Sequence, residues 1–175
     1  PVKGRGFDDC LEKIRSHLSE LNGLSDGEVC QFVSIRLDND DAISVRYLDF
    51  VMHCSRLLGD IESLHPPMGI QCRTGVEMNS VGEIYSRDFP NNSFVALVEM
   101  GAAKSIRTVY HFDHNNLSKL YSTLSLSKSG YWWLINVHGD NVGNSLKRNG
   151  EKVESEELEV DFPFLRASHG SGGIT

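Results

Sequence analysis

The sequence predicts an α+β fold, a mostly antiparallel sheet with two to three helices packed on one face. Three observations lead to this prediction. The length of 175 residues is that of an ordinary single domain. Helical spacing of apolar residues is confined to a few segments, and short strand-like runs recur between turn residues in the middle of the chain. We therefore expect a single domain over residues 1–167 and a flexible Gly/Ser-rich tail over residues 168–175.

The first third of the chain predicts a helix, a strand, a turn and a second helix. Apolar residues repeat at helical spacing near residues 8–22, and residues 28–37 alternate as a half-buried strand would. The run Asp38-Asn39-Asp40-Asp41, here called the acidic turn, follows as a turn. The apolar residues of 43–58 then suit a short strand that passes into a helix, which ends at Gly59.

The middle of the chain predicts short strands. Pro66 and Pro67 cannot continue a helix, because proline lacks an amide donor and restricts the residue before it. Beyond them, strand-like runs separated by turn residues predict an antiparallel meander. These runs lie around residues 69–73, 81–86, 94–100 and 105–113.

The last third predicts one more helix and two further β elements. Apolar residues from Leu117 to Leu124 recur at helical spacing after two asparagines. The strongly apolar run Tyr131–Val137 predicts a central strand. The pair Asn149-Gly150 is typical of a hairpin turn, so we expect the acidic stretch 151–161 to form a solvated edge hairpin.

The composition indicates which partners are disfavoured and in which compartment the chain is expected. The formal charge of −7 disfavours binding to nucleic acid or to an anionic membrane, and no apolar run approaches the roughly 20 residues that cross a bilayer. The four cysteines form no Cys-x-x-Cys pair, which predicts free thiols and a reducing, cytoplasmic location. The glycines follow neither phosphate-loop nor dinucleotide spacing, so no cofactor is expected. Pro1 and the Gly/Ser tail suggest a fragment or processed product of a longer precursor.

One candidate site is a metal centre. On a strand, His111 and Asp113 share a face, and His138 at the end of the 131–137 strand completes a set of two histidines and one carboxylate if the strands are neighbours. The alternative is that these residues cap strand ends. The acidic turn carries oxygen ligands of the type that calcium prefers, but it lacks the glycine and glutamate of a calcium loop. We interpret it as a solvated turn.

A second candidate site is a cysteine nucleophile. A reactive thiolate needs a neighbouring imidazole and a group that orients it. Cys30 follows a plausible loop, and His138 with Asp140 supplies a base and an orienting carboxylate, as His111 with Asp113 also could. The order of an early cysteine and a late histidine resembles that of papain-like hydrolases, which implies cysteine hydrolase activity. Cys30 lacks the aromatic-flanked helix start of that family, and a buried structural cysteine is the alternative interpretation.

The third candidate is a binding surface. Trp132 and Trp133 are adjacent, so on a strand they face opposite sides of the sheet, and one of them can remain exposed as an anchor for a partner. Since no motif decides for an enzyme, we interpret the chain as a non-enzymatic protein-interaction or regulatory domain with a protein partner. The tryptophan pair and the acidic edge 151–161 are the expected contact surfaces. The alternatives are the cysteine hydrolase and the metal-dependent enzyme described above.

Overall fold

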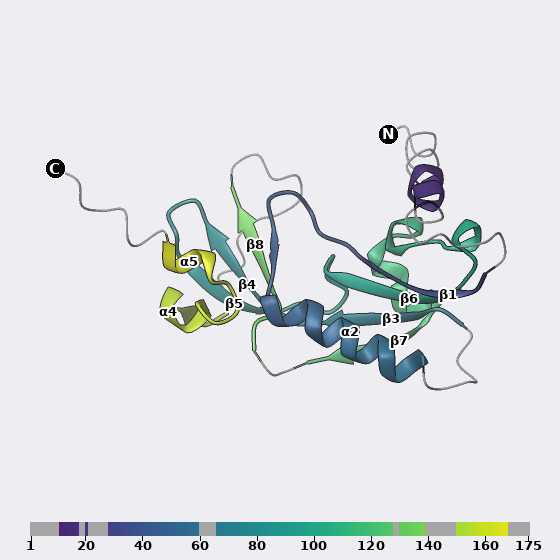
Figure 1. Ribbon diagram of the computed structural model, residues 1–175. Helices are drawn as coiled ribbons and strands as arrows, with labels where there is room; N and C mark the ends of the chain where they lie inside the picture. Colours follow the sequence, from purple (N-terminus) through teal and green to yellow (C-terminus); the bar gives the residue numbers. More distant parts are fainter. Residues whose placement is uncertain are drawn as a thin grey trace.

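A computed structural model of the chain describes residues 11–17, 20, 28–59, 66–127, 130–138 and 150–167, and these form an α+β fold of two sheets and several helices (Figure 1). The predicted fold class is confirmed. The four-stranded sheet has the order β1 (Cys30–Ile35), β6 (Val95–Gly101), β3 (Met68–Cys72), β7 (Ser122–Leu126). The five-stranded sheet has the order β2 (Ala42–Ile43), β8 (Trp133–Val137), β4 (Thr74–Asn79), β5 (Ile84–Asp88), β9 (Lys152–Val153).

The two sheets are joined through a nearly continuous strand. A single residue, Arg73, separates β3 from β4. On one side of this bend β3 pairs with β7, and on the other side β4 pairs with β8, both in parallel. The other five pairings in the described residues are antiparallel. The carboxyl ends of β4 and β8 therefore lie at the same edge of the five-stranded sheet.

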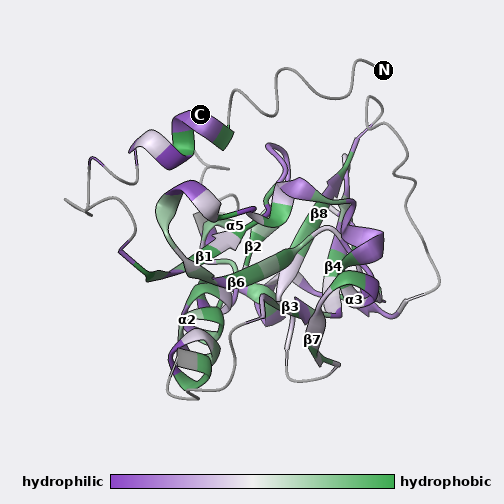
Figure 2. Ribbon diagram, turned by 90° about the vertical axis from the view of Figure 1, so that its right-hand side faces the viewer, coloured by the Kyte–Doolittle hydropathy of each residue, from purple (hydrophilic) through white to green (hydrophobic). Residues whose placement is uncertain are grey.

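Strand β8 lies in the interior of its sheet, between β2 and β4, as its apolar sequence predicted. Its side chains alternate between two cores. Trp133 and Ile135 pack in the cluster under the long helix, whereas Leu134 packs in the cluster on the other face. Burial on both faces explains why this strand reads as a continuous apolar run, and Figure 2 shows hydrophobic colouring along β8.

The long helix α2 (Val45–Gly59) covers one face formed by both sheets. Tyr47, Val51 and Cys54 pack from this helix into the core that contains Trp133. The first turn of α2 is tied to the carboxyl-terminal part of the chain, because Val45 N–H donates to the Asp161 carbonyl at 3.0 Å. This tie fixes the start of α2, and with it the end of the segment that carries the acidic turn.

Short helices and 3₁₀ turns cover the opposite faces. Helices α4 (Ser155–Leu158) and α5 (Phe164–Ala167) flank the five-stranded sheet, where Leu158 and Leu165 join the second core. The four-stranded sheet is covered by four short elements, of which two supply Val109 and Leu117 to a third core. These elements are η1 (Ala103–Ser105), η2 (Val109–His111), η3 (His114–Asn116) and α3 (Leu117–Leu120).

Several sequence predictions about local structure are wrong. The run 105–113 contains η2 and no strand, and the predicted helix over Leu117–Leu124 ends at Leu120, after which β7 begins. Residues 151–161 form the two-residue strand β9 and then α4, so the predicted acidic hairpin is absent from that described range.

Other predictions are confirmed, or confirmed in part. The strand-to-helix passage of 43–58 is present as β2 followed by α2. In the amino-terminal segment, residues 11–17 and 20 are helical, and the predicted ends of that helix lie outside the described residues, as does the tail 168–175. No helix within the described ranges has the length and apolar character needed to cross a membrane.

Candidate active site at the carboxyl edge of β4 and β8

The acidic turn lies at the edge where β4 and β8 end. It connects β1 to β2, and β2 pairs with β8 through Ala42 and Leu134. The backbone N–H of Asn136 in β8 donates to Oδ1 of Asp41 at 3.1 Å, which holds the turn against the end of β8. In α/β sheets, ligands bind outside the carboxyl ends of parallel strands. The acidic turn occupies such a position.

Three carboxylates are crowded in this turn. Burial, and to a smaller extent the neighbouring charges of Asp40 and Asp38, raise the pKa of Asp41 from 3.8 to about 6. The hydrogen bond from Asn136 and the nearby His138 act in the opposite direction. A carboxyl group whose ionisation is disfavoured by two like charges marks a place where negative charge is concentrated.

His138 holds one of these carboxylates. Its Nε2 lies 2.9 Å from Oδ2 of Asp40, although the two residues are 98 positions apart in sequence. Both side chains are partly accessible, with 40% of His138 and 38% of Asp40 exposed. The pairing follows from the fold, because the β2–β8 register places the residue after β8 beside the turn before β2.

Arg36 lies on the other side of the acidic turn. Its Nε is 3.5 Å from Oδ1 of Asp38, and its Nη1 is 2.9 Å from Nδ1 of His114. Because a guanidinium group only donates hydrogen bonds, Nδ1 of His114 is the acceptor. Burial and the charge of Arg36 lower the pKa of His114, which favours the neutral imidazole needed for this contact.

The predicted metal ligands are not brought together. His111 is exposed at the end of η2, and Asp113 is an exposed cap of η3 that accepts from the Asn115 backbone N–H at 3.0 Å. That contact and the Asn115 side chain lower the pKa of Asp113. Within the described ranges, no group of three or more His, Cys, Asp or Glu side chains is arranged to hold a metal ion. Of the predicted set, His138 contacts the acidic turn, through Asp40.

The predicted cysteine site is likewise not assembled around His138. Cys30 begins β1 and the acidic turn follows the far end of that strand, so about 16 Å of extended chain lies between them. Asp140 lies outside the described residues. Among the described cysteines, Cys30, Cys54 and Cys72 are free, and burial raises the pKa of Cys72 to about 12. Such a thiol is protonated at neutral pH.

The tryptophan pair does not form an exposed anchor. Trp132 and Trp133 are both buried, with exposed fractions of 6% and 0%. Trp133 stacks on Phe94 with ring centroids 5.1 Å apart, and Trp132 packs on Phe50 at 5.0 Å. The expectation that one indole remains exposed is wrong, because the chain before β8 turns both rings into the core under α2.

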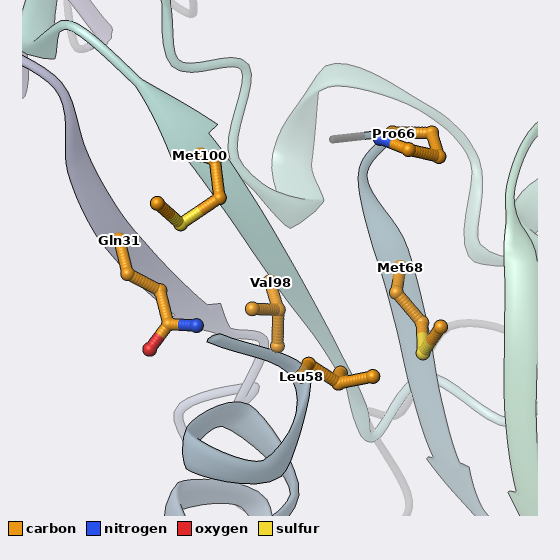
Figure 3. A pocket seen from close by; sticks show the side chains of 6 residues that line it. All are labelled: Gln31, Leu58, Pro66, Met68, Val98 and Met100. Carbon is orange, nitrogen blue, oxygen red and sulfur yellow. The ribbon is translucent and has the colours of Figure 1, made fainter. Parts of the chain in front are cut away.

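A small hollow lies at the other end of α2, far along β1 from the acidic turn. Its volume is about 10 Å³, roughly the space of one water molecule. Figure 3 shows the side chains that line it, which are Gln31, Leu58, Pro66, Met68, Val98 and Met100. The Gln31 amide donates to the Ser55 carbonyl at 2.7 Å, and the other side chains carry no acid or base. This hollow offers no group for catalysis.

Comparison with known protein families decides the class of protein. Residues 9–149 match the model of a family described as "putative rhamnosyl transferase". The chain belongs to this family. The match spans the acidic turn, β1 to β8 and His138, which are the parts that build the edge described above. No curated protein and no solved structure matches the chain.

Membership of the rhamnosyl transferase family corrects the functional interpretation. The interpretation of the chain as a non-enzymatic protein-interaction or regulatory domain is wrong, because the family is named for enzymes that transfer a sugar. The site that sequence reasoning missed is the acidic turn. The available signal was three aspartates in four positions between a strand and a buried helix, but the sequence does not show that His138 and Arg36 flank them.

Proposed function

We propose that this chain transfers a rhamnosyl unit from a phosphate-activated donor to an acceptor hydroxyl, and that the acidic turn binds the donor phosphates. The observation that carries the proposal is the family match over residues 9–149, which includes this turn and both strands that support it. The position of the turn outside the carboxyl ends of β4 and β8 supports it further.

The reaction sets two demands on the site. The bond from the anomeric carbon of the sugar to the donor phosphate breaks, and a bond from that carbon to the acceptor oxygen forms. The proton of the acceptor hydroxyl is released, in the net reaction to solvent, and the departing phosphate takes the electron pair of the broken bond. The site must therefore stabilise the negative charge that develops on the leaving phosphate.

Carboxylates alone repel phosphate, so this turn requires a divalent cation between the two. Mg²⁺ is commonly held by one or two carboxylates and by substrate phosphates. Asp38 and Asp40 suit this role, because their side chains are 46% and 38% exposed. Burial is the main cause of the raised pKa of Asp41, and the charges of Asp40 and Asp38 add to it; a bound cation would relieve this smaller, electrostatic part. When bound, the cation supplies charge neutralisation for the leaving phosphate.

The residues around the turn orient its carboxylates. His138 holds Oδ2 of Asp40, and the Asn136 backbone N–H holds Asp41. A carboxylate that is fixed by a neighbouring hydrogen bond loses less conformational freedom when it binds a cation. In the described ranges no group of three or more His, Cys, Asp or Glu side chains is arranged to hold a metal ion, so a cation held here by Asp38 and Asp40 would take its other ligands from water and the donor phosphates.

The test is turnover of nucleotide-activated rhamnose by the full chain in the presence of Mn²⁺ or Mg²⁺. The readout is release of the nucleoside diphosphate, with and without added acceptor glycans. Asp40→Asn and Asp38→Asn are expected to lower the rate by at least about 100-fold, as loss of a group that supports charge in the transition state does. Asp88→Asn is the matched control, because Asp88 is an exposed carboxylate paired with Arg73 on β3–β4.

The outcomes of this assay separate the roles of the aspartates. If both Asp38→Asn and Asp40→Asn retain turnover, the acidic turn does not bind the donor phosphates. Failure of the unsubstituted chain to release any nucleoside diphosphate across UDP-, GDP- and dTDP-linked rhamnose would remove the proposed transfer itself.

The compartment is part of the same proposal. The free state of Cys30, Cys54 and Cys72 supports a reducing environment such as the cytoplasm. Labelling of the thiols in the protein isolated under alkylating conditions tests this, and a disulfide among these three cysteines would contradict it.

A further inference from the structure

Strand β7 forms an edge of the four-stranded sheet. It pairs with β3 on one side, and among the described residues no strand pairs with its other side (Figure 1). Three of its five residues are exposed, which are Ser122, Leu124 and Ser125. An edge strand presents backbone N–H and C=O groups with which another strand can pair. The open side of β7 is therefore a surface to which a further strand can be added.

The pairing with β3 shows which backbone groups of β7 lie on the open side. The Leu126 carbonyl accepts from the Arg73 N–H at 2.8 Å, so the backbone of Leu126 faces β3. Because successive residues of a strand direct their backbone groups to alternate sides, Thr123 and Ser125 face outward. In the described part of the chain, the backbone N–H and C=O groups of these two residues form no hydrogen bond. They are available to a partner strand.

The sequence of β7 lacks the features that protect a sheet edge. Proteins protect edges with very short strands, charged side chains, prolines or bulges. β7 is five residues long and has the sequence Ser-Thr-Leu-Ser-Leu, which contains no charge and no proline. Its register with β3 is unbroken from Ser122 to Leu126. By contrast, the edge strands β2 and β9 of the other sheet have only two residues each.

We propose that β7 is a dimerisation edge, which pairs antiparallel with β7 of a second copy of this chain across a two-fold axis at Leu124. In this register Thr123 lies opposite Ser125 of the second copy, and each such pair exchanges both of its N–H···O bonds. Leu124 lies opposite its own copy in the pair without hydrogen bonds, where side chains are closest. A shift along the strand would leave one outward residue opposite a residue outside β7.

The charge of this edge permits self-association. The formal charge of −7 disfavours contact between two copies in general, but the pairing of two β7 strands brings no like charges together. It also covers Leu124, whose exposed fraction is 43% in the single chain. One pair of edge strands gives an interface at the small end of specific interfaces. We therefore expect a reversible dimer with a Kd on the order of 10–100 µM.

The test is sedimentation velocity of the full chain at concentrations below and above this Kd. The average mass of the unsubstituted chain is expected to rise from that of a monomer to that of a dimer. Leu124→Lys and Leu124→Glu should each weaken the dimer by about 10-fold or more, because two like charges then lie directly opposite each other. Val81→Lys is the control, since Val81 is 78% exposed in the turn between β4 and β5.

An equimolar mixture of the two Leu124 variants tests the register. Unlike charges lie opposite each other in the mixed dimer, so the mixture should dimerise at least about 10-fold more tightly than either variant alone. A folding defect does not explain such a recovery, because each variant would keep its defect in the mixture.

Ser125→Pro tests the backbone pairing itself. It removes an outward N–H, and proline is tolerated on an edge strand whose N–H faces solvent. The dimer is expected to weaken by about 10-fold or more, while urea unfolding shows a folded chain. If this variant does not fold, the mixture of Leu124 variants decides.

The remaining outcomes overturn the proposal. If the unsubstituted chain stays monomeric at all concentrations, a second copy is not the partner of β7, even where the edge binds an extended segment of another protein. If both Leu124 variants dimerise as tightly as the unsubstituted chain, a different surface holds the dimer. If the mixture does not recover the dimer, the antiparallel register is wrong. The proposed function concerns the acidic turn and is unaffected by each of these results.

Discussion

Gly75 lies directly against the indole ring of Trp133. A Cβ atom at Gly75 would lie 2.1 Å from Cδ2 of that ring, far inside the contact distance of two carbons. Trp133 Nε1 also donates to the Cys72 carbonyl at 2.9 Å. The indole of β8 is therefore fixed to both sides of the bend between β3 and β4. This close packing lies at the amino-terminal ends of β4 and β8, next to the first pair of their parallel register, Val76 with Leu134. The acidic turn lies at the opposite, carboxyl ends of the same two strands.

Gly75→Ala is expected to destabilise the protein by about 3 kcal/mol or more, because the ring is enclosed by the core and overpacking of a dense core is costly. Urea unfolding monitored by tryptophan fluorescence measures the change. Val81→Ala is the control, since Val81 is 78% exposed in a turn and should shift stability by less than about 0.5 kcal/mol. A Gly75→Ala protein as stable as the unsubstituted chain would contradict the observed packing.

Asp161 ties the carboxyl-terminal segment to the start of α2. Its Oδ1 accepts from Ser44 Oγ at 3.2 Å and from Arg46 Nε at 2.6 Å. Asp161→Ala is expected to lower the free energy of unfolding by about 2–3 kcal/mol, chiefly because the buried Ser44 hydroxyl loses its acceptor, whereas the half-exposed Arg46 is screened by solvent.

Asp161→Asn keeps an acceptor for Ser44 and should recover part of this loss. Chemical denaturation of both variants measures the difference. Glu159→Gln, which removes an ion pair with the exposed Arg166, is expected to cost less than about 0.5 kcal/mol. Equal stability of the alanine variant and the unsubstituted chain would mean that Asp161 does not secure α2.

The contact of His114 with Arg36 predicts a pH dependence. The pKa of His114 is lowered in the folded protein by burial and by Arg36, while Asp113 and Asp38 oppose this with smaller effects. In the unfolded chain the group titrates near pH 6.5. Below that pH the unfolded state binds a proton that the folded state does not, so stability falls as pH drops from about 6.5 toward the folded pKa and is unaffected above it.

His114→Asn removes this dependence. Urea unfolding at pH 7.5, 6.5 and 5.5 measures the free energy of unfolding of both proteins. Below pH 6.5 the unsubstituted chain should lose more of this free energy than the His114→Asn variant does. Asp41 affects stability with the opposite sign, because its raised pKa favours the folded state on acidification. Both proteins contain Asp41, so its contribution cancels in the difference between them. A shift in favour of the unsubstituted chain at pH 5.5 would contradict the lowered pKa of His114.

Local patterns predicted the elements whose packing is simple. The uninterrupted apolar run of β8 follows from burial on both faces, and the strand-to-helix passage of 43–58 follows from its change in periodicity. Strand β4 was not predicted, because it lies in the stretch of turn residues expected between the runs 69–73 and 81–86, whereas its Gly75 is required by the close approach of the Trp133 ring. The 105–113 segment was misassigned because its buried residues alternate, while Glu99 and Thr108 impose a turn.

The candidate site depended on long-range contacts that a sequence does not display. The sequence predicted the acidic turn as a solvated turn and His138 as a possible metal ligand. Their meeting follows from the β2–β8 register, and the approach of His114 to Arg36 spans 78 positions. The residue types therefore indicated which chemistry is possible, but only the pairing of the strands shows which of these residues lie together in one site.

In the proposed function, the acidic turn binds donor phosphates through a divalent cation. Calorimetric titration of the full chain with UDP, GDP and dTDP, in the presence and absence of Mn²⁺, tests it most directly. We expect that at least one of these nucleotides binds only with Mn²⁺, and that Asp38→Asn combined with Asp40→Asn abolishes this binding while Asp88→Asn does not. Nucleotide binding of equal strength without the cation, or in the double variant, would contradict it.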